Sequence, residues 1–265
     1  MNESFSGQEP RAPLAPVPTP QTVRVALPAM VPMATYIILG FTVFVYLMQM
    51  ASVAVFGYAS NASQIDWLEV YGARFNTAIR MGEVWRFITP AFLHASVPHI
   101  FFNMYALLSI GSFLERHFGH KRFVLLYFLG AFSGNVFSFL LTGENGYSVG
   151  ASTAIFGLIA AQVVFFYQNR KLFGGQAKQA ITNTAFIIAV NLLISLAPGI
   201  DGWGHVGGLL GGAMFAWFAS PRWEVAGISP DLHLEDQREF REIVLGAGLV
   251  IIVFGALAAW AMFLK

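Results

Sequence analysis

Hydrophobic residues occur in long runs along this chain, and charged residues fall in short clusters between the runs. Seven long stretches contain no Asp, Glu, Lys or Arg. A helix needs roughly 20 mainly apolar residues to cross the hydrocarbon core of a bilayer, and each stretch is long enough. The pattern therefore predicts seven membrane-spanning helices, at Met33–Val55, Pro98–Leu114, Phe123–Leu141, Gly150–Tyr167, Ala180–Leu196, Gly204–Ala219 and Ile243–Phe263.

The predicted spans are of two kinds. The second, fourth and sixth are short and rich in Gly, Ser, His or Asn, whereas the first and last are uniformly apolar. This contrast predicts an all-α, polytopic membrane protein with a packed six-helix core over residues 29–219. Residues 220–265 then form a cytoplasmic linker and a seventh helix. Residues 1–28 are proline-rich, and we expect them to be a disordered cytoplasmic tail without a signal peptide.

Composition supports a membrane protein. Hydrophobic residues make up 56% of the chain and charged residues only 11%, and the mean hydropathy is +0.62. Soluble domains carry about 25% charged residues. The net charge of +1 gives no indication of a nucleic-acid partner. Because the chain has no cysteine, disulfides, thiol catalysis and thiolate metal sites are excluded.

The short loops predict the orientation. Basic residues lie in the loops after the second and fourth spans, whereas the loops after the third and fifth spans hold only Glu144 and Asp201 as charged residues. The positive-inside rule places basic loops in the cytoplasm. We therefore expect a plasma (inner) membrane protein with a cytoplasmic N-terminus. The second, fourth and sixth spans then begin at the outer face.

Four polar side chains from three predicted spans lie at that outer end. His99 and Asn103 are near the start of the second span, Ser152 near the start of the fourth, and His205 near the start of the sixth. Polar groups within a membrane are costly and usually functional. Because all four fall at one depth, they predict a single site that opens toward the outer face.

Spacing within the spans favours close contact between helices. Small residues recur at i, i+4, i+7 and i+11 from Gly150, and Gly208 and Gly212 follow His205 at i+3 and i+7. Stripes of small residues let membrane helices approach closely. Such an approach is needed for a hydrogen bond of about 2.6–3.2 Å between Ser152 and His205.

These residue types indicate nucleophilic catalysis that needs no cofactor. Ser152 would attack a peptide carbonyl, and His205 would take its proton and return it to the leaving amine. The side chains of His99 and Asn103, with the Ser152 backbone N–H, are suited to an oxyanion hole. Since Asp201 lies in a loop four residues before the histidine, we expect a Ser–His dyad.

Each of these residues also has a structural interpretation. A serine in a membrane helix often bonds a carbonyl of its own helix, and small-residue stripes are common packing devices. The four other histidines, at or near interfaces or in a loop, are interpreted as structural: His94, His117, His120 and His233. No HExxH motif is present and all four aspartates lie in loops, which disfavours metal-dependent and aspartyl proteolysis.

Several motifs appear in the order found in one family. They are Trp85-Arg86, the His99-to-Asn103 segment, Glu115 with Gly119, Gly150-Ala151-Ser152 followed by Thr153, and His205 with Gly208 and Gly212. On these motifs the chain resembles the rhomboid intramembrane serine proteases from Trp85 to Gly212. It departs from the family at Thr153, where glycine is usual. A β-branched residue there puts the local helix approach in question.

The resemblance implies a six-helix rhomboid core and a role for each motif. Ser152 is implied to be the nucleophile, His205 the general base, and His99 and Asn103 the oxyanion hole. Phe156 would stack on the histidine. Gly150 and Gly208 would support the site by close packing, and Trp85 and Arg86 would stabilise the first loop. The extra C-terminal span fits the six-plus-one arrangement of some rhomboids.

The function expected from residues and resemblance together is that of an intramembrane serine endopeptidase. Its partners would be single-span transmembrane proteins, cleaved in the lipid bilayer near its outer face. The alternative is a catalytically silent rhomboid-like protein that binds or escorts membrane helices. A transporter is disfavoured, because outside the cluster only Asn135 and Asn191 could line a polar path.

Overall fold

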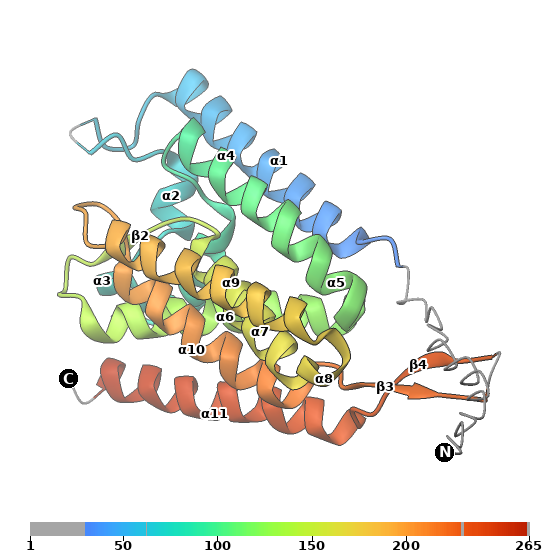
Figure 1. Cartoon of the computed structure of the whole chain (residues 1–265). Coiled ribbons are helices and arrows are strands. Elements are labelled where there is room, and N and C mark those ends of the chain that lie inside the picture. The colour runs from blue at the N-terminus through green and yellow to red at the C-terminus, as the bar shows by residue number, and fades with distance from the viewer. Residues whose placement is uncertain (1–29, 62, 229–230, 264–265) are drawn as a thin grey trace, which may run out of the picture.

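The computed structural model describes residues 30–61, 63–228 and 231–263. The predicted tail at residues 1–28 lies outside them. Helices dominate the described part of the chain (Figure 1). The long ones are α1 (Met33–Phe56), α4 (Val97–Ala106), which runs through the π-helical η3 (Leu107–Gly111) into α5 (Ser112–Phe118), α6 (His120–Leu141), α7 (Ser152–Gln168), α9 (Gly175–Ile194), α10 (Gly202–Ala219) and α11 (Phe240–Phe263).

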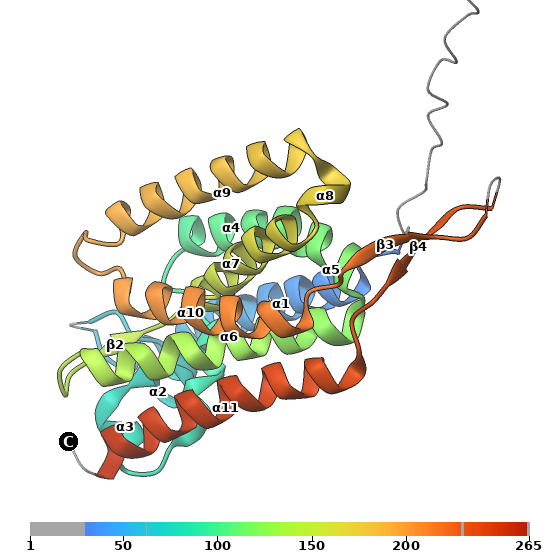
Figure 2. The same ribbon diagram turned by 60° about the horizontal axis from the view of Figure 1, so that its bottom comes forward.

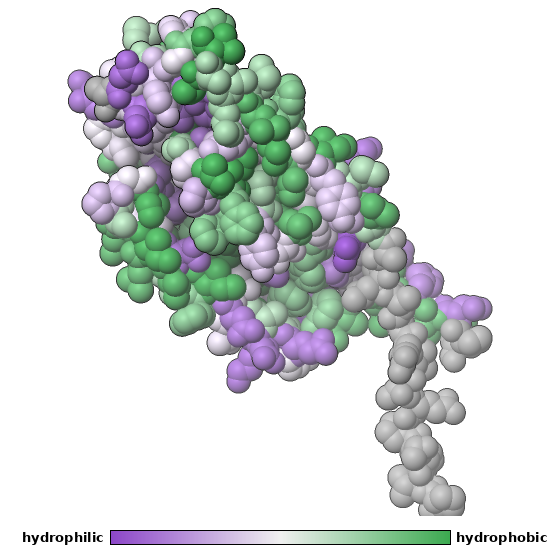
Figure 3. Space-filling model, turned by 90° about the horizontal axis from the view of Figure 1, so that it is seen from above, coloured by the Kyte–Doolittle hydropathy of each residue, from purple (hydrophilic) through white to green (hydrophobic). Residues whose placement is uncertain are grey.

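Each predicted span coincides with one of these helices, so the polytopic all-α prediction is confirmed. Five of the segments in the described residues are long and apolar enough to cross a membrane, and they are α1, α4 to α5, α6, α9 and α11. The helices α7 and α10, at 17 and 18 residues, are shorter or less apolar. Hydrophobic side chains cover much of the face formed by α1 and α4, and hydrophilic ones gather mainly at its margins (Figure 3).

The centre of the molecule is formed by α6, α7 and α10. These three helices pack on one another, with α11 on one outer side and α9 on another (Figure 2). The α9 helix packs mainly on α7, and its buried residues are only Ala177 and Thr184. Figure 1 shows that α4, α7 and α10 all begin at the end of the molecule where β2 lies.

The segment between α1 and α4 folds over that end. It contains α2 (Trp67–Gly72), β1 (Arg74–Phe75), α3 (Asn76–Arg80) and the 3₁₀ turns η1 (Val84–Phe87) and η2 (Thr89–Phe92). The β1 strand pairs antiparallel with β2 (Tyr147–Ser148), with Arg74 opposite Ser148. This pairing ties the first loop to the loop that enters α7. We refer to the end that these loops cover as the site end.

The opposite end is fixed by polar caps. Glu115 is fully buried, and its carboxylate accepts hydrogen bonds from the backbone N–H groups of Ala34 and Thr35, both at 2.7 Å. A carboxylate at a helix N-terminus satisfies free N–H groups and complements the helix dipole. Gly119 ends α5 with φ of +77°, a conformation that favours glycine. The Glu115 and Gly119 motif thus closes this end around α1.

The linker before α11 is more structured than the sequence indicates. It forms an antiparallel hairpin of β3 (Trp223–Ala226) and β4 (His233–Asp236). His233 therefore lies on a strand and not in a loop. Arg122 holds the hairpin to α6 through a 2.6 Å ion pair with Asp236. Strands this short, separated by a turn, leave little periodicity for the sequence to display.

Candidate active site

Ser152 is the first residue of α7, and a glycine two residues earlier sets its position. Gly150 has φ of +125°, which other residues rarely adopt. Its N–H donates to the carbonyl of Pro90 at 2.9 Å, which fixes the entry to α7 against the first loop. The serine side chain therefore projects from a helix start, beside the loop residues.

His205 faces Ser152 from the first turn of α10. Its Nε2 lies 2.9 Å from the Ser152 Oγ, a hydrogen-bond distance. The histidine is 7% exposed. Asp201 caps α10, because its carboxylate accepts from the N–H of Gly204 at 2.9 Å. Because the cap fixes the residue at which α10 begins, it also fixes the position of His205 along the helix axis relative to Ser152.

Glycines make this contact possible. A Cβ at Gly208 would lie 2.1 Å from the backbone oxygen of Thr153, and one at Gly212 would lie 2.3 Å from that of Gly157. No side chain fits at such distances, so the backbones of α7 and α10 touch directly below the site. The close approach expected from the small-residue stripes is present.

Thr153 is accommodated by glycines on the two neighbouring helices. The threonine is 2% exposed. A Cβ at Gly134 of α6 would lie 2.6 Å from the Thr153 Cβ, and one at Gly204 of α10 would lie 3.0 Å from its Cγ2. The β-branched side chain fills the space that these two glycines leave. The α7 and α10 helices still meet closely at this turn.

Phe156 covers one face of the histidine ring. The two ring centroids are 4.1 Å apart, and the planes are nearly parallel at 10°. Phe156 lies one turn below Ser152 on α7, so one helix supplies both the hydroxyl and the stacking ring. The stacked phenyl ring restricts tilting of the imidazole out of its own plane.

His99 and Asn103 adjoin Gly150. A Cβ on Gly150 would lie 2.6 Å from the His99 Nε2 and 3.7 Å from the Asn103 Nδ2. The Asn103 amide donates one hydrogen to the His99 carbonyl at 3.1 Å, which leaves its second N–H for another acceptor. The structure thus brings the four polar residues predicted from the sequence to one place.

Two more residues contact this cluster, and sequence reasoning missed both. The Ser195 hydroxyl, at the end of α9, lies 2.6 Å from the His205 Nδ1. His94 is 1% exposed, and its Nε2 accepts from the Ala151 N–H at 3.4 Å. His94 therefore supports the segment that presents Ser152. Its position five residues before His99, directly after an apolar run, is the only sequence signal for this role.

Comparison with known proteins gives the family. A family model described as "Rhomboid domain" matches residues 81–222, more than half of the chain. The chain belongs to the rhomboid family. The Bacillus subtilis (strain 168) Rhomboid protease GluP is 39% identical over 153 residues, which cover 57% of this chain and 29% of that protein.

Two further relatives come from eukaryotes. Rhomboid-like protease 1 of Toxoplasma gondii is 38% identical over 144 residues, covering 54% of this chain and 49% of that protein. RHOMBOID-like protein 2 of Arabidopsis thaliana is 31% identical over 203 residues, covering 75% of this chain and 63% of that protein. This rhomboid therefore spans less than two thirds of each of these three relatives.

Trp85 and Arg86 of this rhomboid hold the first loop together. Arg86 is 3% exposed, and its guanidinium donates to the carbonyls of Ala73 at 2.6 Å and Val70 at 2.7 Å. Trp85 donates its indole N–H to the Tyr71 carbonyl at 3.0 Å. Both side chains thus bond the α2 end of the loop, and neither contact reaches the Ser–His pair.

Asp201 joins the α10 cap of the rhomboid to the loops above it. Its carboxylate accepts from the Ser138 hydroxyl at 2.6 Å and pairs with the guanidinium of Arg74 at 3.6 Å. Arg74 is 1% exposed and also donates to Thr142 at 3.1 Å. The Asp201 backbone carbonyl accepts from the His205 backbone N–H at 3.1 Å, whereas the two imidazole nitrogens contact the hydroxyls of Ser195 and Ser152. The ion pair between Asp201 and Arg74 thus joins the start of α10 to the β1 strand.

A pair of acids lies in the loop between α1 and α4 of the rhomboid. Asp66 caps α2 by accepting from the N–H groups of Leu68 and Glu69. Burial raises the pKa of Glu69 to about 7, and the nearby Asp66 charge adds to the effect. Tyr147 of β2 hydrogen bonds the Glu69 side chain. The hydrogen bond between Tyr147 and the Glu69 carboxyl therefore links α2 to the loop that enters α7.

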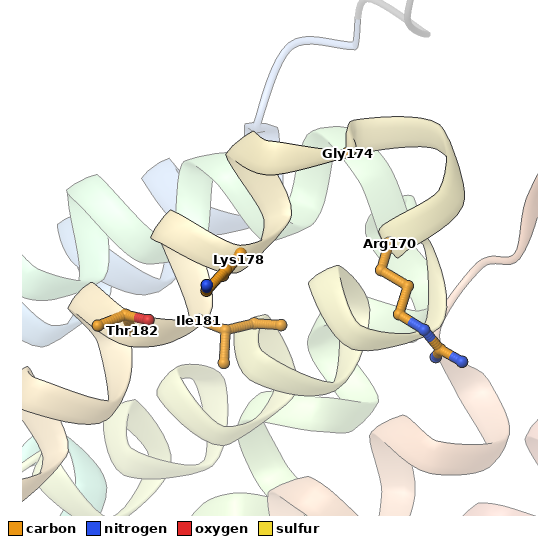
Figure 4. Close-up of a pocket in the computed structure, with 5 residues that line it drawn as sticks. All are labelled: Arg170, Gly174, Lys178, Ile181 and Thr182. Carbon is orange, nitrogen blue, oxygen red and sulfur yellow. The ribbon is translucent and has the colours of Figure 1, made fainter.

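A surface pocket lies at the other end of the rhomboid. It is lined by Arg170, Gly174, Lys178, Ile181 and Thr182, where α8 (Arg170–Phe173) turns into α9. Figure 4 shows the Arg170 side chain pointing away from that of Lys178. Both basic side chains are exposed. The pocket therefore does not bring the charges of Arg170 and Lys178 together at one position. Within the described residues, no group of His, Cys, Asp and Glu could hold a metal ion.

Proposed function

We propose that this rhomboid is an intramembrane serine endopeptidase that uses Ser152 and His205. The observation that carries the proposal is the 2.9 Å contact between the Ser152 Oγ and the His205 Nε2. The stack of Phe156 on the imidazole supports it, because general-base catalysis needs a ring held in a fixed orientation. The name of the Bacillus relative, a rhomboid protease, is consistent with this chemistry.

In the proposed reaction the Ser152 oxygen attacks a peptide carbonyl while its proton moves to the His205 Nε2. The carbonyl oxygen becomes an oxyanion, which requires hydrogen-bond donors in place before the attack. His99, Asn103 and the Ser152 backbone N–H adjoin this position and would donate to it. His205 then gives the proton to the leaving amine, and water releases the acyl group from the serine.

The substrates that we propose are single-span membrane proteins. Ser152 and His205 lie near the starts of α7 and α10, so the site is close to one end of the helices. A helix that reaches it must unwind locally, because cleavage needs an extended backbone. The preferred substrates would then be transmembrane segments that unwind easily near that end.

The proposed orientation places the site end outside a plasma membrane and the N-terminus in the cytoplasm. The ends of α5 and α8 lie opposite the site end (Figure 1). These ends and their flanks carry basic residues, which are Arg116, Lys121, Arg122, Arg170, Lys171 and Lys178. Basic loops are retained in the cytoplasm. The site would then open toward the outer face.

A fluorophosphonate probe tests the proposal without a known substrate. The purified protein in detergent should be labelled on Ser152, because an activated serine attacks the phosphorus. Labelling should fall at least about 1000-fold in Ser152→Ala and His205→Ala, in line with the loss of triad members elsewhere. Two matched controls, Ser109→Ala and His233→Ala, remove exposed side chains and should label like the wild type.

The alternative function gives a different result. A catalytically silent helix-binding rhomboid would give no labelling in a folded, monodisperse preparation. Such a result would count against the protease and favour the silent class.

A further inference from the structure

Ser195 is the C-terminal cap of α9 and lies directly against the start of α10. Although ten residues separate it from His205, a short turn brings the two together. A Cβ at Gly202 would lie 3.1 Å from the Ser195 backbone oxygen and 3.4 Å from its Cβ, so the first residue of α10 contacts the cap. Ser195 and His205 are each 7% exposed. Their contact is therefore sheltered from solvent.

The Ser195 hydroxyl makes two short contacts. Its Oγ lies 2.6 Å from the Asn191 backbone oxygen and 2.6 Å from the His205 Nδ1. A backbone carbonyl oxygen can only accept, and a hydroxyl has one hydrogen to give. That hydrogen must go to Asn191, since two oxygens at this distance repel without a hydrogen between them. The second contact is then an N–H of the imidazole donating to the Ser195 Oγ.

This assignment fixes the tautomer of the histidine. With its hydrogen on Nδ1, a neutral imidazole carries its free lone pair on Nε2. The Nε2 atom is the one that faces the Ser152 hydroxyl at 2.9 Å. The chain of donors therefore runs from Ser152 to His205, from His205 to Ser195, and from Ser195 to the end of α9. Only this direction leaves Nε2 able to take the serine proton.

The geometry also restrains the ring in two independent ways. Phe156 fixes its plane from one face, and Ser195 fixes its rotation within that plane from the edge. When Nε2 gains a proton, the Nδ1–H donor becomes part of a cation, and such hydrogen bonds are stronger than neutral ones. Asp201, the nearest acid in sequence, is occupied with Gly204 and Ser138. Among the described residues, Ser195 is the hydrogen-bond partner of Nδ1.

We propose that Ser195 is a positioning residue that holds His205 in the Nδ1–H tautomer, the form needed by a general base. This inference rests on the proposed function for its catalytic consequence. Ser195 does not contact the reacting atoms. It acts through the imidazole, in the place that a carboxylate takes in a catalytic triad. The acceptor here is neutral and is supplied by the end of a neighbouring membrane helix.

Two measurements on Ser195→Ala test the proposal. The first is the nitrogen chemical shifts of His205 in ¹⁵N-histidine-labelled protein, which distinguish the two tautomers directly. The wild type should show the Nδ1–H form, and Ser195→Ala should show a mixture with the Nε2–H form. The second is the fluorophosphonate labelling rate, which should fall about tenfold, as expected for one lost hydrogen bond.

The control is Asn191→Ala. Within the described part of the chain, the Asn191 side chain donates to the Ile187 carbonyl, and the variant keeps the backbone oxygen that Ser195 needs. It should retain the Nδ1–H tautomer and the wild-type labelling rate. Ser195→Cys is a second variant of similar shape, with a sulfur that is a weak acceptor. Ser195→Cys should also show a mixture of the two tautomers. It provides the test if the alanine variant folds poorly.

Failure of this inference is distinct from failure of the proposed function. If Ser195→Ala keeps the Nδ1–H tautomer and labels at the wild-type rate, Ser195 has no positioning role. An unlabelled wild type would instead contradict the protease. The tautomer measurement needs no labelling, so it would still decide the role of Ser195 in that case.

Discussion

At the scale of single residues, Thr153 shows how an unusual side chain is absorbed by its neighbours. The family resemblance leads one to expect glycine after the serine. In the structure the threonine methyl occupies the space above Gly134 and Gly204. Among the described residues, its buried hydroxyl has no hydrogen-bond partner. The methyl therefore stabilises the packing, and the hydroxyl contributes nothing to it.

Thr153→Val tests this assignment. Valine keeps the branched shape and removes a buried hydroxyl that lacks a partner, so the free energy of unfolding should stay the same or rise by about 1 kcal/mol. The fluorophosphonate labelling rate should not change. Thr153→Gly is the matched comparison, because it empties the space and should lower the free energy of unfolding by about 1–2 kcal/mol. A destabilised valine variant would show that the hydroxyl is bonded.

The polar residues of the site could be predicted because they are rare in apolar helices. Ser152, His205, His99 and Asn103 stand out for this reason, and the structure brings them together. Ser195 could not be found in this way, since a serine at a helix end is common and is usually a cap. Its role depends on a turn that brings it back to α10, and no spacing in the sequence predicts that turn.

At the scale of helices, the contact between α7 and α10 depends on the absence of side chains. The backbone oxygen of Thr153 lies 2.1 Å from the position that a Cβ of Gly208 would take. Packing of this kind is sensitive to one methyl group, because neither backbone can move without displacing its helix. The distance between Ser152 and His205 is therefore set by glycines one turn or more below them.

Gly208→Ala should separate the two helices. We expect a loss of about 1–3 kcal/mol in the free energy of unfolding from overpacking, and slower fluorophosphonate labelling because the Ser–His contact lengthens. Gly248→Ala is the control, as Gly248 also lies within a helix but has nothing within 4 Å of an added Cβ. Thermal melting and labelling of both variants check the expectation. Equal behaviour of the two would contradict it.

The helices were easier to predict than the strands. Runs without charge mark each span, since a charged side chain in the bilayer is costly. The β1 and β2 strands have two residues each and pair across about 70 positions of sequence, which is too short to display alternation. The π-helical turn η3, between α4 and α5, also leaves no recognisable pattern. These elements arise from tertiary contacts and not from local preference.

At the scale of the whole molecule, polar loops connect the site end across distant parts of the chain. Arg74 of β1 is bonded to both the loop after α6 and the cap of α10. Glu69 of α2 is bonded to Tyr147 in the loop before α7. The apolar helices are thus joined above the site by buried polar groups, one of which titrates near neutral pH.

The raised pKa of Glu69 predicts that stability depends on pH. Its pKa is about 7 in the folded chain, against an ordinary value of 4.5 for a glutamate carboxyl. Folded Glu69 then keeps its proton at pH values where the unfolded carboxyl has lost it, so the contribution of Glu69 to stability falls as pH rises from about 4.5 to 7. The buried His94, whose pKa is lowered to about 3, contributes in the opposite direction, so the Glu69 contribution is measured as the difference in melting temperature between the wild type and a Glu69 variant.

Glu69→Gln should remove the Glu69 contribution, since the amide is neutral at every pH, so the melting temperature of the variant should rise relative to that of the wild type as pH increases from about 4.5 to 7. Glu144→Gln is the control, because Glu144 is exposed in the loop after α6 and its replacement should leave the wild-type slope in place. Melting temperatures of the three proteins, measured from pH 4.5 to 8, decide the matter. A Glu69→Gln slope equal to that of the wild type would show that another group titrates.

The directions of the helices around the site have an electrical consequence. The α4, α7 and α10 helices begin there, and α9 ends there at Ser195. A helix carries about half a positive charge at its start and half a negative charge at its end. In the proposed reaction, negative charge appears on the substrate oxygen near the three helix starts. Positive charge appears on His205, which contacts the end of α9 but itself lies in the first turn of α10. The starts of α4 and α7 and the end of α9 thus set up a field along the direction of charge separation, before any substrate arrives.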